Sequence, residues 1–90
     1  MVRFRVAKDD VGVLLGDLDA REPSVLYAKV VKQLGAAAAG PNDANDAALE
    51  IDETYAEAFR EWLARSTLRH TRNGDAEKAR AFERVRASEH

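Results

Sequence analysis

Two stretches of the chain carry apolar side chains at the 3.6-residue spacing of an amphipathic helix. The first covers residues 23–35, where the apolar face gathers Leu26, Tyr27, Val30, Val31 and Leu34. The second covers residues 53–70, where the apolar arc gathers Tyr55, Ala58, Phe59, Trp62, Leu63 and Ser66. Pro23 suits the first turn of a helix, because a missing N–H does little harm there. We therefore predict helices over both stretches.

The N-terminal residues follow a different period. Apolar residues and arginines alternate from Val2 to Val6, which is the two-residue period of a half-buried strand. This alternation predicts a strand over residues 2–7 with Arg3 and Arg5 facing water.

Residues 9–18 fit two structures. The helical face would be Val11, Leu14, Leu15 and Leu18, and the strand face would be Val11, Val13 and Leu15. Gly12 and Gly16 would cost a helix on the order of 2 kcal/mol relative to alanine. The charged residues before Val11 suit a turn, so the sequence favours a β-hairpin here.

The second half of the chain has clear start and stop signals. The polar segment 40–46 is typical of a linker, and residues 48–51 fit a short strand. Asp52 is placed to cap the helix over 53–70, and Asp75 follows an Asn-Gly break and caps a last helix over 75–87.

These elements predict the fold class. A chain of 90 residues seldom builds more than one core, so we expect one small domain over residues 1–90. It belongs to the α+β class and is predominantly helical, with a short N-terminal strand or β-hairpin followed by three amphipathic helices. A sub-boundary, if present, falls in the linker 40–46.

Composition excludes several kinds of chemistry. The chain has no cysteine, which rules out disulfides, thiolate nucleophiles and cysteine-ligated zinc. No uncharged apolar run approaches the ~18 residues of a membrane span, so we expect a cytoplasmic protein with no membrane partner.

Charge is distributed unevenly around a net charge of -2. Residues 42–59 carry six acidic groups and no basic one, whereas residues 60–90 carry eight basic and five acidic groups. This division indicates two electrostatic faces on one small body. A dedicated nucleic-acid-binding domain is usually more basic, so nucleic acid is the less favoured partner.

The strongest candidate for a binding surface lies where the helical pattern breaks. If the helix continues past Ser66 at about 100° per residue, Arg69 and His70 fall on the apolar face and Leu68 on the polar side. The core contact or the helix should therefore end near Ser66. The last helix has only two large apolar residues and should dock weakly. We therefore expect a protein partner or a second copy to contact Arg65, Arg69, Arg72, Phe82 and Val85.

Catalytic candidates are few. Asp17 and Asp19 could hold a magnesium ion, which makes a small metal-dependent enzyme one alternative, although loop solvation or capping is the more common role of such a pair. His70 and His90 belong to no readable cluster. We therefore assign no catalytic residue, no metal ligand and no cofactor.

The first 35 residues resemble a ribbon-helix-helix DNA-binding module. In that family two copies pair their N-terminal strands and place the outward side chains in the major groove, so the resemblance implies that Arg3 and Arg5 face bases. Gly12 and Gly16 within the implied first helix depart from the pattern. The resemblance implies a dimeric repressor, or an antitoxin whose residues 47–90 would bind a toxin.

Binding is the function that these features favour. The leading hypothesis is a non-enzymatic intracellular regulatory protein, acting through a protein partner or as a homodimer. The DNA-binding protein and the metal-dependent enzyme are the alternatives.

Overall fold

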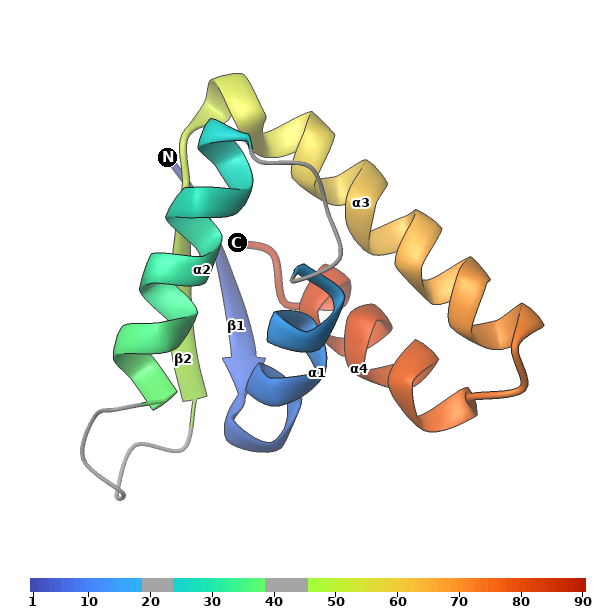
Figure 1. The fold of residues 1–90 in the computed structure, drawn as a ribbon. Coiled ribbons are helices and arrows are strands. Elements are labelled where there is room, and N and C mark those ends of the chain that lie inside the picture. The colour runs from blue at the N-terminus through green and yellow to red at the C-terminus, as the bar shows by residue number, and fades with distance from the viewer. Residues whose placement is uncertain (19–23, 39–45) are drawn as a thin grey trace.

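The computed structural model describes residues 1–18, 24–38 and 46–90. Two strands and four helices follow one another in the order β1 (Val2–Ala7), α1 (Lys8–Leu18), α2 (Val25–Ala38), β2 (Asp46–Ile51), α3 (Glu53–Arg72) and α4 (Ala76–Ala87) (Figure 1). The predominantly helical α+β class is confirmed, with four helices in place of the predicted three.

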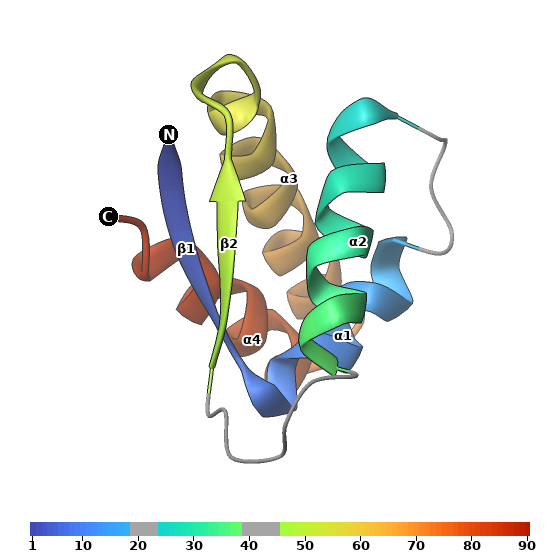
Figure 2. The same cartoon turned by 90° about the vertical axis from the view of Figure 1, so that its left-hand side faces the viewer.

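The strands form one antiparallel pair, in which Val2 lies opposite Ile51 and Ala7 opposite Asp46. Figure 2 shows this pair in front of α3 and α4. The inward face is buried and carries Phe4, Val6, Ala47, Leu49 and Ile51. Arg3 and Arg5 lie on the opposite, exposed face, as the alternation predicted. The predicted strand 48–51 is also confirmed and begins two residues earlier.

Other parts of the chain cap both outer edges of this sheet. The backbone groups of Arg3 and His90 exchange hydrogen bonds of 3.1 and 2.9 Å, and the Ser88 hydroxyl accepts one of 2.8 Å from the Arg5 N–H. On the β2 side, the Gln33 side chain accepts from the Glu50 N–H and donates to the Glu50 carbonyl. Occupied edge groups restrict pairing with another strand.

Residues 8–18 form a helix, so the predicted hairpin is wrong. Val11, Leu14 and Leu18 are buried on one side of α1, and burial of each contributes about 1.5–3 kcal/mol. This gain exceeds the cost of Gly12 and Gly16, both of which lie on the exposed side. Tertiary packing therefore outweighs local helix propensity.

The remaining helices lie close to their predicted positions. The helix expected at 23–35 is confirmed as α2, although Pro23 itself lies outside the described residues, as does nearly all of the predicted linker 40–46. Asp52 accepts a hydrogen bond from the Thr54 N–H and caps α3. Asp75 accepts one from the Lys78 N–H and caps α4. Both caps were predicted from the sequence.

Helix α4 packs firmly on the core. Phe82 and Val85 are completely buried, and the Phe82 ring meets the Trp62 ring edge to face with centroids 5.3 Å apart. Ala79 and Ala81 are buried as well, which lets α4 approach its neighbours closely. The expectation that a thin apolar face leaves Phe82 and Val85 for a partner is therefore wrong, because the chain buries both by itself.

Candidate functional site

The structure separates the five residues predicted to contact a partner. Phe82 and Val85 lie in the core, and only the arginines of α3 remain accessible. Helix α3 runs along one side of the molecule (Figure 1). An open, shallow hollow of about 350 Å³ lies against its C-terminal half and is lined by Arg65, Leu68, Arg69, Arg72 and Asn73.

We define the α3 outer face as the exposed residues Glu57, Glu61, Arg65, Leu68 and Arg72. They recur every three or four positions, which places them on one side of the helix. The face is acidic in its first half and basic in its second. Leu68 is 50% exposed and sits between two arginines, as the helical count predicted when it placed this leucine on the polar side.

The opposite side of α3 explains why the outer face points to water. Its buried residues are Ala56, Phe59, Trp62, Leu63, Ser66 and His70. The apolar arc predicted Ala58 in place of Ala56, but Ala58 is exposed. The core contact continues past Ser66 to His70, so the predicted end of the contact is wrong.

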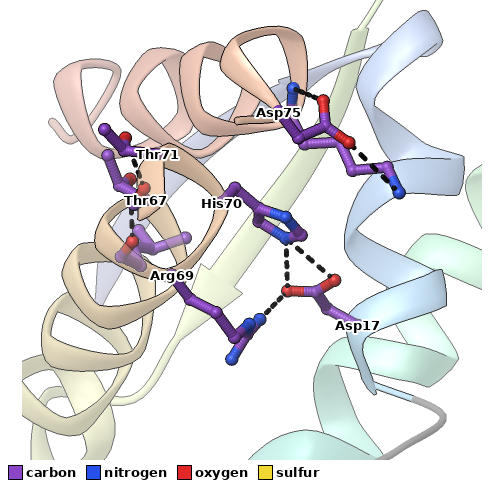
Figure 3. Close-up of polar contacts among 8 residues, drawn as sticks. Asp17, Thr67, Arg69, His70, Thr71 and Asp75 are labelled. Carbon is purple, nitrogen blue, oxygen red and sulfur yellow. Dashed lines mark hydrogen bonds and ion pairs between the residues drawn. The ribbon is translucent and has the colours of Figure 1, made fainter. Parts of the chain in front are cut away.

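His70 takes a core position because it finds a polar partner there. Its Nε2 lies 3.1 Å from both carboxylate oxygens of Asp17 in α1 (Figure 3). Its ring stacks on Phe82 with centroids 5.5 Å apart. Arg69 also donates to the Asp17 carboxylate. One carboxylate thus joins the end of α1 to the C-terminal half of α3.

This cluster was missed because its members are remote in sequence. Asp17 and His70 are separated by 53 positions, and no spacing rule connects residues that far apart. One signal was available: a histidine on an apolar face needs a buried hydrogen-bond partner. Applied to His70, that rule would have indicated a polar partner from another part of the chain.

The cluster connects α1 to the C-terminal half of α3, and the threonine hydroxyls beside it are engaged in contacts of their own. The neighbouring threonines, Thr67 and Thr71, donate their hydroxyls to backbone carbonyls within the helix, and Ser66 is fully buried. Within the described residues, no three side chains of the ligating types His, Cys, Asp and Glu converge on a site that could hold a metal ion. Asp17 is occupied by Arg69 and His70, and its proposed partner Asp19 lies outside the described residues.

A second open groove, of about 510 Å³, lies between α1 and α4. Its charges largely neutralise one another. Asp10 is buried and accepts hydrogen bonds of 2.8 and 3.0 Å from Arg84, and Lys78 lies 3.5 Å from Asp75. This pairing leaves the groove less charged than the C-terminal half of α3.

The arginines expected to read DNA lie together on the exposed face of the sheet. Arg3 approaches Glu50 on the next strand at 3.9 Å. The edges of β1 are taken up by β2 and by residues 88–90, so the two-copy ribbon of a ribbon-helix-helix dimer does not form in this arrangement. DNA binding through Arg3 and Arg5 stays a prediction that would need a different geometry.

Comparison with protein-family models, with curated proteins and with solved structures finds no significant match. Among the described residues, no helix combines the length and apolar character required to cross a bilayer.

Proposed function

We propose that the protein is a non-enzymatic binding module that takes an acidic protein segment on the C-terminal half of the α3 outer face. The observation that carries the proposal is the half-exposed Leu68 set between Arg65 and Arg72. Arginine is enriched at protein interfaces, and the exposed part of Leu68 adds apolar area beside it that a partner would remove from water.

The two arginines are free to take a new partner. Within the described chain Arg72 has no ion partner, and Arg65 is held only by Glu61 at 3.8 Å, in an exposed pair. Such a pair is worth a few tenths of a kcal/mol, so it can rearrange at little cost. Arg69 adds a third positive charge beside Arg65 and Arg72, and its side chain is held by the Asp17 carboxylate. A carboxylate can accept two parallel hydrogen bonds from an arginine, which favours an acidic partner.

The acidic half of the same face argues for protein over nucleic acid. Glu57 and Glu61 continue the line of Arg65 along the helix. A nucleic-acid backbone that followed this line would meet repelling carboxylates, and the chain as a whole carries a net charge of -2. A partner segment with carboxylates beside the arginines and cationic or neutral groups beside the glutamates avoids that repulsion.

Fluorescence anisotropy with a labelled helical peptide rich in glutamate and leucine tests the proposal. The wild type should bind at low salt, and the Arg65→Ala, Arg72→Ala variant should bind roughly tenfold more weakly, a loss of ~1.4 kcal/mol. Lys32→Ala removes an exposed cation of α2 and is the matched control, which should bind like the wild type.

Two results would contradict this function. One is peptide binding that survives loss of both arginines. The other is tighter binding of a labelled DNA duplex than of the peptide, if the Arg3→Ala, Arg5→Ala variant loses that DNA binding. This result would support the DNA-binding alternative.

A further inference from the structure

We infer that the acidic segment is the N-terminal half of α3 in a second copy of this chain, so that two α3 helices pair antiparallel through their outer faces. This inference rests on the proposed function and names the partner. Its basis is the order of charge along one exposed helix face, with Glu57 and Glu61 before Arg65 and Arg72.

Antiparallel pairing brings the acidic half of the face alongside the basic half of the second copy's face. With the two-fold axis level with the midpoint between Glu61 and Arg65, each Glu61 lies opposite the second copy's Arg65. Glu57 then lies level with the second copy's Arg69, and Arg72 lies level with Thr54, about 4.5 Å along the axis from Glu57. A parallel pair would set glutamate against glutamate and arginine against arginine, so the charge order favours only the antiparallel arrangement.

Leu68 and two alanines that flank the α3 outer face fall into the same register. Leu68 lies opposite Ala58 of the second copy, and both are exposed in the single chain. Ala64 is half-buried beside the two-fold axis and meets its own counterpart. The small side chains of Ala58 and Ala64 let the two helices approach closely. Leu68 can then contact the second copy's helix.

Helix electrostatics within one chain explain only part of the pattern. An acidic start and a basic end complement the helix macrodipole, but that effect fades within the first and last turns. Glu61 and Arg65 lie in the middle of a 20-residue helix, where the dipole gives no preference. Their mutual contact accounts for this pair, and it does not involve Arg72 or the half-exposed Leu68.

The expected dimer is weak. A helix of 20 residues is about 30 Å long, so the pair forms one short seam, whereas stable protein interfaces bury about 1,200–2,000 Å². Because its contacts combine exposed charges with few apolar groups, the association should depend on concentration and weaken with salt.

Cysteine cross-linking tests the register, since the chain has no cysteine of its own. Ala64→Cys lies beside the axis and should form a disulfide-linked dimer under mild oxidation. Ala58→Cys is the matched control: it would lie about 15 Å from its own copy along the helix and should not cross-link alone, but it should cross-link when mixed with Leu68→Cys. Equal cross-linking of all three single variants would overturn the register.

Charge reversal tests the partner. Glu57→Lys, Glu61→Lys makes the face wholly basic, and Arg65→Glu, Arg72→Glu makes it wholly acidic. In sedimentation equilibrium at low salt, the wild type should approach twice its 9.9 kDa mass as its concentration rises. Each variant alone should stay monomeric, and an equimolar mixture of the two should form a heterodimer.

The outcomes separate this inference from the proposed function. A wild type that stays monomeric at every concentration, or a mixture that does not associate, overturns self-pairing. If the wild type then still binds the acidic peptide through Arg65 and Arg72, the binding function stands with another partner. Loss of peptide binding as well would remove both. Circular dichroism on each variant confirms that the fold is retained.

Discussion

Replacement of Phe82 by alanine tests whether α4 is held by the chain's own core. Phe82 is fully buried between Trp62, whose ring lies at 85° with centroids 5.3 Å apart, and His70, whose ring stacks at 5.5 Å. If α4 needed a partner to cover its apolar residues, removal of this ring would change little in the isolated chain. If the chain covers them itself, the loss should be large.

The burial of Phe82 sets the size of the effect. Truncation of a buried phenylalanine to alanine removes its transfer free energy and leaves a cavity, at a cost of about 3–5 kcal/mol. Aromatic geometry of the kind seen with Trp62 accounts for roughly 0.5–1.5 kcal/mol of such a loss. Domains are stable by only about 5–15 kcal/mol, so Phe82→Ala should lose about a fifth or more of the free energy of unfolding.

Urea unfolding followed by tryptophan fluorescence measures this loss, because Trp62 is the only tryptophan and contacts the altered ring. Leu68→Ala is the control at low protein concentration. Its side chain is 50% exposed, so the free energy of unfolding should change by about 0.5 kcal/mol or less. If Phe82→Ala cost no more than Leu68→Ala, the described packing of α4 would be refuted.

Three further changes have defined outcomes. Gly12→Ala should stabilise the fold by about 0.8–1 kcal/mol and raise the thermal midpoint, because Gly12 is exposed in a helix and a Cβ there meets nothing within 4 Å. A lower midpoint would contradict the helical assignment of α1. Asp75→Ala should cost about 1 kcal/mol in urea unfolding through loss of the α4 cap, and Asp75→Asn should cost less; equal losses would argue against capping. Hydrogen bonds from Arg60 hold the pKa of Glu89 below its ordinary value, so the pair stabilises the fold above the unfolded-state pKa and that contribution disappears as the pH falls through the lowered pKa. Glu89→Gln should therefore lower the melting temperature at neutral pH but not in acid, and a difference that persisted at low pH would contradict this pairing.

Much of the secondary structure could be predicted because its determinants are local. Alternation placed β1, 3.6-residue periodicity placed α2 and α3, and Asp52 and Asp75 marked the starts of two helices. Each of these signals lies within a few residues of the element it describes.

The errors arose where a distant part of the chain decides the outcome. Glycine propensity favoured a hairpin at residues 8–18, but burial of one face against the rest of the core makes a helix. The burial of His70 depends on Asp17, and that of Phe82 on Trp62 and His70. Long-range packing is also the reason that α4 was wrongly predicted to present Phe82 and Val85 to a partner, since the chain buries both residues itself.

Amide chemical shifts followed by nuclear magnetic resonance during a protein dilution series test the central claim most directly. The account predicts concentration-dependent shifts at Glu57, Glu61, Arg65, Leu68 and Arg72, with constant shifts elsewhere on the surface and throughout α4. Shifts concentrated at Arg3 and Arg5 on the open face of the sheet, or spectra that do not change with concentration, would contradict it.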